Sequence, residues 1–277
     1  IPGMLFEEMG IIYLGPVDGS DMKGILRLLK EASNIEGPVM VHVLTHKGAG
    51  YLPAERHPAR FHGTEPFDIE TGLPSKPRVK ANYTDIFSTV MRKLGDRDEK
   101  VVAITAAMTD GTGLKRFHNM FPGRFFDVGI AEEHAVTFAA GLAAAGLKPI
   151  FAVYSSFLQR AYDQILHDVC IQNLPVVFAI DRAGLVGSDG ETHQGIFDIS
   201  YLSAIPNMTI MAPKNKWELS DMIKYAVDFP TPIAVRYPRG EAYDGLKEYR
   251  QPISAGKSEW IYRESEIALV ALGSMVK

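Results

Sequence analysis

The residues best placed to do chemistry are the adjacent carboxylates Glu132 and Glu133, which open a predicted helix directly after an apolar strand. That helix, residues 132–145, is so rich in alanine and glycine that it should be packed on most sides. A carboxylate in its first turn is partly buried and faces the positive end of the helix dipole, a common setting for proton transfer. An N-terminal capping role explains the same two residues equally well.

Arginine side chains follow two other predicted strands. Arg182 comes directly after one strand, and Arg236 and Arg239 lie at the end of another. Guanidinium groups match phosphate oxygens in a bidentate way, so several of them at one edge of a sheet predict an anion-binding site. The alternative is that these arginines are merely solvated, as surface arginines usually are.

A long loop at residues 184–195 is the third candidate. It is glycine-rich and carries Asp189 and His193, so it is too polar for a core and is predicted to face a substrate. A hydrolase triad through His193 is disfavoured, because no Gly-x-Ser-x-Gly turn joins a strand to a helix. The P-loop and Gly-x-Gly-x-x-Gly patterns are also absent, and Gly48-Ala49-Gly50 alone is a weak phosphate-loop signal.

The elements that position these residues alternate regularly from Tyr83 onward. Short apolar runs predict strands at residues 101–106, 125–128, 149–153, 176–180, 209–211 and 233–237. Helices are predicted between them, at residues 84–94, 132–145, 157–172 and 214–228. Continuous apolar strands indicate a sheet covered on both faces, so the predicted fold class is α/β, with an open, mostly parallel sheet and helices on both faces. Ligands bind outside the carboxyl ends of such strands, where all three groups of residues lie.

The chain of 277 residues divides into regions. Residues 1–52 combine a predicted helix at 21–34 with a strand at 38–44, and residues 53–80 are Pro-rich and weakly periodic, which is typical of a linker. Residues 81–248 form the α/β domain, and residues 249–277 begin a further domain. The sequence starts without methionine and stops in a β-rich run at residues 267–274, so we expect it to be a piece of a longer protein.

Composition excludes several function classes. A formal net charge of −4 gives no electrostatic case for nucleic acid or an anionic membrane. The longest apolar run, residues 135–147, is too short to span a bilayer, and no basic and hydrophobic leader opens the chain. Cys170 is the single cysteine, which excludes internal disulfides and Cys-rich metal sites and indicates a reducing compartment. We therefore expect a globular, cytoplasmic protein.

With these residues, the chain closely resembles the 1-deoxy-D-xylulose-5-phosphate synthases, thiamine-diphosphate enzymes of the transketolase superfamily. The resemblance covers essentially the whole sequence and is most specific at residues 15–19, 45–51, 127–140, 154–164, 181–195 and 236–240. It implies that residues 1–52 are the tail of the diphosphate-binding domain, that 81–248 are the pyrimidine-binding domain, and that 249–277 start the transketolase C-terminal domain. It also implies a homodimer.

The activity that this resemblance implies is a transferase reaction. Pyruvate is decarboxylated and its two-carbon unit passes to D-glyceraldehyde 3-phosphate, giving 1-deoxy-D-xylulose 5-phosphate and CO2 at the first step of non-mevalonate isoprenoid synthesis, which also supplies thiamine and pyridoxal. The cofactors are thiamine diphosphate and Mg²⁺. In this superfamily the Mg²⁺ ligands lie upstream of the first residue of this sequence, so we expect no metal ligand in the chain and no activity from the chain alone.

The resemblance also implies roles for individual residues in cofactor binding. Glu132 would hydrogen-bond the aminopyrimidine ring and drive the proton transfer that activates the cofactor, while Phe157 would stack on that ring. Met108 and Ile130 would hold the bent shape of the cofactor. Lys47 would approach the diphosphate.

Substrate roles follow in the same way. The aldehyde's phosphate would be bound by Tyr154, Arg182 and Arg239, and the reacting carbons would be lined by His62, Asp189 and His193, of which the two histidines are candidate catalytic residues.

Two residues depart from the family pattern, Ser20 in place of a histidine and Glu133 in place of a glutamine. Two alternatives stay open. One is a different member of the superfamily, such as a transketolase or the beta subunit of a 2-oxoacid dehydrogenase. The other is a non-catalytic dimerisation module.

Overall fold

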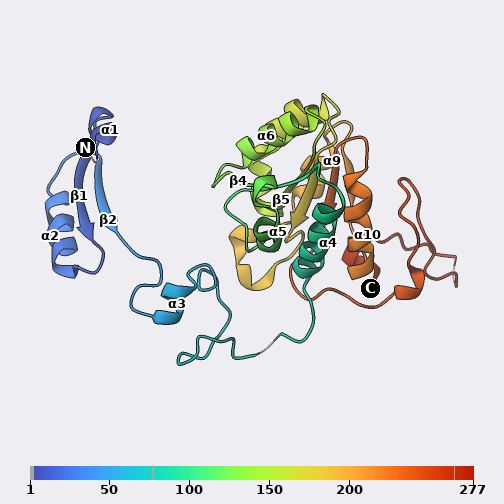
Figure 1. Cartoon of the computed structure of the whole chain (residues 1–277), viewed down its shortest axis with the longest axis horizontal. Coiled ribbons are helices and arrows are strands. Elements are labelled where there is room, and N and C mark those ends of the chain that lie inside the picture. Colours follow the sequence, from blue (N-terminus) through green and yellow to red (C-terminus); the bar gives the residue numbers. More distant parts are fainter. Residues whose placement is uncertain (1–2, 77, 265) are drawn as a thin grey trace. The chain divides into compact units, whose positions relative to one another are not determined.

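A computed structural model describes residues 3–76, 78–264 and 266–277 of the chain. Ile1 and Pro2 in the predicted first region, Pro77 in the predicted linker and Ser265 in the predicted third region lie outside the described residues. The chain separates into two compact units, Ile1–Pro77 and Arg78–Lys277, and each is described by itself (Figure 1).

The first unit is built around two parallel strands, β1 (Ile12–Asp18) and β2 (Val39–Leu44). Helix α1 (Met4–Glu8) precedes β1, and α2 (Met22–Ala32) connects the strands. Asp21 begins α2 because its carboxylate accepts a hydrogen bond of 3.0 Å from the amide of Gly24. The predicted helix and second strand are confirmed. Strand β1 was not predicted, because Gly15-Pro16 interrupts its pattern and its register shifts between Leu14 and Val17.

The predicted linker at residues 53–80 contains local structure. Helix α3 (Leu52–Arg56) starts it, and an isolated antiparallel bridge joins Phe67 to Pro74. The rings of Tyr51, Phe61 and Phe67 contact one another with centroids 5.0–5.9 Å apart. This aromatic cluster gives a Pro-rich segment a small apolar centre of its own.

The second unit contains a sheet of six parallel strands in the order β4-β3-β5-β6-β8-β7. The strands are β3 (Val101–Thr105), β4 (Phe125–Asp127), β5 (Lys148–Tyr154), β6 (Val177–Asp181), β7 (Thr209–Met211) and β8 (Ile233–Arg236). Every residue of β3 and β6 is buried, as continuous apolar strands require. The predicted parallel α/β sheet is thus confirmed.

Helices cover both faces of this sheet (Figure 1). On one face, α4 (Tyr83–Arg97), α5 (Lys115–Met120) and α10 (Lys216–Val227) pack against alternate strand residues such as Ala103 and Ile150. On the other face, α6 (Glu132–Ala144), α9 (Asp198–Ser203) and the segment after β5 pack against the intervening ones, such as Ile104 and Phe151. The period of two along each strand therefore divides the core into two layers.

The segment after β5 differs from its prediction as a single helix at residues 157–172. It contains α7 (Ser155–Leu158), a 3₁₀ turn (Gln159–Ala161), α8 (Tyr162–Gln164) and a π-helical stretch (Ile165–Cys170). Ile165 and Cys170 are both fully buried. These residues are five positions apart, a spacing that the wider π turn brings onto one face and that an α-helix does not. Apolar periodicity alone could not reveal this change of pitch.

Residues 249–264 and 266–277 contain no strand. The β-rich run at residues 267–274 instead runs into a short 3₁₀ turn, Gly273–Val276, at which Gly273 is buried against Ala212. No neighbouring segment of the described residues pairs with this run, and a lone strand leaves its backbone groups unpaired. In the described part of the chain, no helix has both the length and the apolar character needed to cross a membrane.

Two helix glycines give a stability test with opposite expected signs. A Cβ on Gly95 of α4 would lie 2.5 Å from the Phe121 ring, whereas a Cβ on Gly141 of α6 would meet nothing within 4 Å. Gly95→Ala should lower the free energy of unfolding by about 1–3 kcal/mol through overpacking, and Gly141→Ala should raise it by up to about 1 kcal/mol through helix propensity. Trp217 and Trp260, the two tryptophans of the chain, both lie in the second unit, so tryptophan fluorescence in urea follows this unit alone. Equal shifts for both variants would contradict the packing at Gly95.

Candidate functional site

The carboxyl ends of all six strands lie at one edge of the sheet, because all of them are parallel. The chain leaves β3 towards α5 on one face and leaves β5 towards α7 on the other. In open α/β sheets, ligands bind where the connections of two adjacent strands diverge in this way, and we refer to this place between β3 and β5 as the crevice. The two connections touch at Gly111 and Tyr154, where a Cβ on the glycine would lie 1.7 Å from the tyrosine Oη. Only glycine permits this approach.

Asp127, the last residue of β4, holds the loops around this crevice together. Its carboxylate accepts hydrogen bonds from the Ala107 amide at 2.8 Å, the Thr109 hydroxyl at 2.8 Å and the Gly129 amide at 3.0 Å. Ala107 has a φ of 58°, a left-handed conformation that costs energy for a residue with a side chain. Asp127 thereby fixes both the loop after β3 and the loop that leads into α6.

Glu132 is the first residue of α6 and is only 2% exposed, whereas Glu133 is exposed. Adjacent helical residues point about 100° apart, so one of the two turns inwards and the other towards solvent. The inner carboxylate does not stand alone, because the guanidinium Nη1 of Arg160 lies 3.2 Å from Glu132 Oε2. Burial of the charge is thus compensated by an ion pair.

Arg160 is a site residue to which the sequence assigned no role. Its side chain is 49% exposed, and its guanidinium carbon lies 5.8 Å from the centre of the Phe157 ring while its Nη1 reaches Glu132. A signal was present, since Phe157 and Arg160 are three residues apart and residues at that spacing share a helix face. Nothing in the sequence indicated that this helix face packs against α6.

Phe157 lies between two other predicted site residues. Its ring stacks on Tyr154 with centroids 5.8 Å apart and meets His193 edge-on at 5.3 Å. Met108 is buried in the core layer against which Phe157 and Tyr154 pack. Ile130, on the loop before α6, is 78% exposed. The structure therefore brings Met108, Tyr154, Phe157 and His193 together beside the crevice.

Asp189 joins two of the three arginines that were predicted to bind an anion. Its Oδ2 accepts from Arg182 Nε at 3.2 Å and from Arg239 Nε at 2.9 Å. The guanidinium of Arg182 also lies 3.7 Å from the centre of the Tyr154 ring, a close cation–π contact. Four predicted substrate-binding residues therefore form one connected cluster.

Arg182 is fixed by its backbone as well as its side chain. It has a φ of 59°, and its amide donates a 2.7 Å hydrogen bond to the carboxylate of the preceding residue, Asp181. Asp181 is fully buried and also accepts a 2.8 Å hydrogen bond from the Thr84 hydroxyl. Burial raises the pKa of Asp181 to about 6, against the opposing effect of the Arg182 charge. Burial likewise raises the pKa of Tyr154.

Arg236 does not belong to this cluster, contrary to the expectation that three arginines would bind one anion. It forms a two-point ion pair with Asp198 at the start of α9, with Nε–Oδ2 at 2.8 Å and Nη2–Oδ1 at 3.1 Å. Asp198 is only 1% exposed, so it needs a guanidinium to offset its desolvation. Local sequence does not distinguish Arg236 from Arg239, because the carboxylate that pairs with Arg236 is 38 residues away.

Lys47 and His62 lie in the first unit, and the structure brings these two together. Lys47 Nζ donates to His62 Nδ1 at 2.8 Å, and both side chains are exposed. Among residues 3–76, 78–264 and 266–277, no group of three or more His, Cys, Asp or Glu side chains is arranged to hold a metal ion.

Comparison with known protein families identifies the family to which this chain belongs. Residues 79–244 match the family described as transketolase, pyrimidine binding domain, and residues 1–45 match the 1-deoxy-D-xylulose-5-phosphate synthase family. The chain belongs to the transketolase pyrimidine-binding domain family. The crevice beside Glu132 and Phe157 thus lies in the pyrimidine-binding domain of this family, and the Arg182–Asp189–Arg239 cluster lies on the same strand edge.

Similar curated relatives include bacterial enzymes named 1-deoxy-D-xylulose-5-phosphate synthase. The protein from Lachnoclostridium phytofermentans is 60% identical over 277 residues, and that from Halothermothrix orenii is 54% identical over 277 residues. Both matches cover the whole of this chain but 44% of the relative. The chain therefore spans less than half the length of these curated relatives.

Solved structures agree at the level of the fold. A transketolase from Campylobacter jejuni has a TM-score of 0.54 and 19% identity, and the match covers 87% of this chain and 49% of that one. A structure described as a split gene transketolase, inactive beta4 tetramer, has a TM-score of 0.52 and 28% identity, covering 58% of this chain and 53% of that one.

The raised pKa of Asp181 makes a prediction about the pyrimidine domain. An unfolded aspartate titrates near 3.9, so the folded state holds this proton more tightly than the unfolded state. The Asp181 contribution to stability is therefore fully present below about pH 4 and is lost as the pH rises through about 6. Asp181→Asn removes this titration. Relative to the parent chain, the free energy of unfolding of the variant should therefore rise by about 2 kcal/mol between pH 4 and pH 7. Urea unfolding followed by tryptophan fluorescence measures the difference, and a pH-independent difference would contradict the assignment.

Proposed function

We propose that this sequence forms the catalytic pyrimidine-binding part of a 1-deoxy-D-xylulose-5-phosphate synthase. Such an enzyme decarboxylates pyruvate and transfers the two-carbon unit to D-glyceraldehyde 3-phosphate, giving 1-deoxy-D-xylulose 5-phosphate and CO2. Relatives with this name are 54–60% identical to the chain over its whole length. The observation that carries the proposal is one strand edge that holds both a buried carboxylate, Glu132, and a linked pair of arginines, Arg182 and Arg239.

The proposed cofactor is thiamine diphosphate, and the residues at the crevice suit its aminopyrimidine ring. A flat nitrogen heterocycle needs an aromatic or apolar face and a carboxylate to hydrogen-bond a ring nitrogen. Phe157 and Met108 supply the faces and Glu132 the carboxylate, while exposed Ile130 is free to contact the rest of the cofactor. When bound, this cofactor supplies a carbanion that attacks carbonyl carbons.

The chain's own groups then have distinct tasks. Glu132 exchanges a proton with the aminopyrimidine, and Arg160, 3.2 Å away, orients its carboxyl group. Lys47 is assigned to the diphosphate. The Mg²⁺ that accompanies the diphosphate in this superfamily is assigned to a segment outside this sequence, on the basis of the resemblance alone.

Substrate binding requires an exchange of partners in the arginine cluster. Arg182 and Arg239 are assigned to the phosphate of the aldehyde together with Tyr154, but both Nε atoms now donate to Asp189. An incoming phosphate must share or replace that carboxylate, which frees Asp189 to act at the reacting carbons beside His193. His62 receives the same assignment from the resemblance.

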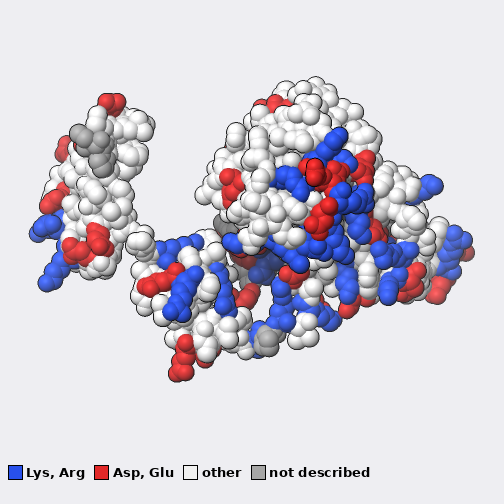
Figure 2. All heavy atoms as spheres, viewed as in Figure 1, with Lys and Arg blue, Asp and Glu red and all other residues white. Residues whose placement is uncertain are grey.

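The assembly and the domain limits are also proposals. We assign residues 1–52 to the tail of the diphosphate-binding domain, 53–80 to a linker, 81–248 to the pyrimidine domain and 249–277 to the start of the C-terminal domain. A homodimer is proposed, supported by the largely uncharged surface over α6, which contrasts with the charged surface over α4 and α5 (Figure 2). The single, buried Cys170 supports a reducing, cytoplasmic location.

The first test of the function compares two neighbouring carboxylates in a protein of the relatives' full length that carries this sequence. Glu132→Ala should lower turnover by about a hundred- to ten-thousandfold, the usual share of acid–base catalysis. Glu133→Gln should have little effect, because this side chain is exposed. The measurement is product formation from pyruvate and glyceraldehyde 3-phosphate. The reverse ranking would contradict the role of Glu132.

The second test concerns the phosphate of the aldehyde substrate. Charge-assisted hydrogen bonds contribute about 1.5–3 kcal/mol each, so Arg182→Ala should lower kcat/KM for glyceraldehyde 3-phosphate about ten- to a hundredfold. The KM for pyruvate should change much less. An unphosphorylated aldehyde is the control, and equal losses for both aldehydes would count against the arginine cluster as the phosphate site.

A further inference from the structure

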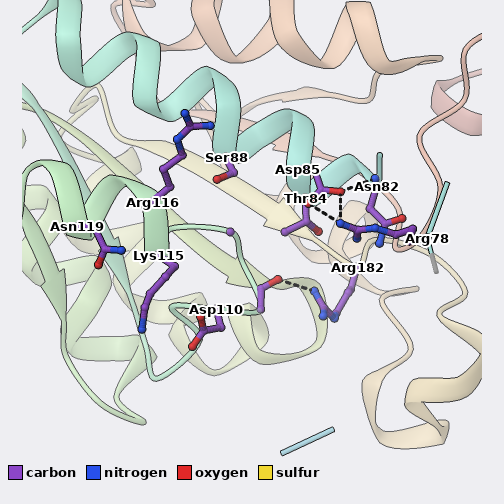
Figure 3. Close-up of a pocket in the computed structure, with 12 residues that line it drawn as sticks. Arg78, Asn82, Thr84, Asp85, Ser88, Asp110, Lys115, Arg116, Asn119 and Arg182 are labelled. Atoms are coloured by element: carbon purple, nitrogen blue, oxygen red, sulfur yellow. Dashed lines mark hydrogen bonds and ion pairs between the residues drawn. The ribbon is translucent and has the colours of Figure 1, made fainter. Parts of the chain in front are cut away.

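A cavity lies beside the loop after β3 and is lined by Gly111. It has a volume of about 460 Å³ and lies between α4, the loop after β3 and the first turns of α5 (Figure 3). This volume is within the range of small-molecule sites. Arg182 lines it, whereas Arg239, Asp189 and Glu132 do not.

Three of the six charged residues that line this cavity are already paired. Arg78 pairs with Asp85 at 2.9 Å, and Arg182 pairs with Asp181 and Asp189. These pairs leave little net charge. The electrostatic character of the cavity is therefore set by the remaining lining residues.

The remaining charges are unbalanced towards the positive. Lys115 and Arg116 line the cavity, both are exposed, and neither has an ion-pair partner among the described residues. Asp110 is the lining carboxylate that remains against them, and it too has no ion-pair partner within the described ranges. Two cations against one anion favour a negatively charged ligand.

Neutral hydrogen-bond donors complete the cavity. Ser88 of α4 and Asn119 of α5 line it, and in Figure 3 Arg116 extends towards α4, where Ser88 lies. A hydroxyl and an amide can each donate to an oxygen acceptor, and the guanidinium can bind two oxygens at once. Several donors from two helices suit a tetrahedral anion with three free oxygens better than a planar carboxylate.

We propose that this cavity binds the phosphate or diphosphate group of a small metabolite, with Lys115 and Arg116 as the residues that supply the charge. We refer to it as the Lys115 cavity. It adjoins the subsite assigned to the aldehyde substrate through Arg182, which lines it, but Arg239 and Asp189 of that subsite do not line it. The proposal goes beyond the proposed function and does not depend on it.

Titration of the whole chain with inorganic pyrophosphate at about 0.15 M salt, where surface charges are screened as in a cell, tests the proposal. Backbone amide NMR should show saturable shifts at residues 86–90 and 108–119. The double variant Lys115→Gln, Arg116→Gln should bind at least about tenfold more weakly by calorimetry, since each charged contact removed costs about tenfold or more. Lys93→Gln, a matched loss of an exposed charge on α4 outside the cavity, should leave binding unchanged.

Arg239→Ala separates the two sites, and it should leave the shifts at residues 108–119 intact. Loss of binding in Arg239→Ala with retention in the double variant would overturn the proposal, because the anion would then sit on the substrate cluster. Absence of saturable shifts at residues 108–119 would also overturn it. Tryptophan-detected unfolding checks that the double variant is folded, and the single variant Lys115→Gln, at an exposed position, gives the same comparison with less perturbation.

Discussion

The crevice of the candidate site depends on the parallel pairing of β3 with β5. This pairing brings the end of β3 beside the end of β5, while the chain leaves the two strands towards opposite faces of the sheet. The crevice that results has Gly111 on one side and Tyr154 on the other, at a distance that no side chain on residue 111 would permit. Asp127 at the end of neighbouring β4 then ties the adjoining loops together through three hydrogen bonds. A rigid sheet edge therefore sets the geometry before any ligand arrives.

Arginine–carboxylate pairs dominate the electrostatics of this edge. Glu132 pairs with Arg160, Asp198 with Arg236, and Asp189 with both Arg182 and Arg239. The desolvation of each buried carboxylate is offset by a guanidinium, which stays charged at any ordinary pH. The consequence is a site whose charged groups are already held in place by one another. Under the proposed function, a phosphate or a cofactor would bind by exchanging partners within these pairs, so part of its binding energy would be offset by the contacts that it replaces.

Sequence reasoning predicted the sheet well and some of its connections poorly. Fully apolar strands such as β3 and β6 read as buried parallel strands because both faces of each strand must be covered. Strand β1 escaped prediction because Gly15-Pro16 breaks its pattern, and the π-helical turn at Ile165–Cys170 escaped because its pitch depends on what it packs against. Arg160 was given no role, and Arg236 was wrongly predicted to bind an anion. Both errors have one cause, because the ion-pair partner of an arginine lies far away in the sequence.

The sequence by itself determined the alternation of strands and helices, which follows from local propensity and from the periodicity of apolar residues. It also determined which chemical groups follow the strand ends, where the carboxyl ends of parallel strands share one edge. The adjacent pair Glu132 and Glu133, and Arg182, were identifiable on that basis alone. Only the tertiary structure decided which of Glu132 and Glu133 turns inwards, which arginines share Asp189, and that Lys115 and Arg116 line a cavity beside Arg182. These choices depend on contacts between segments tens of residues apart, and the free energy of such contacts is absent from any local window of the chain.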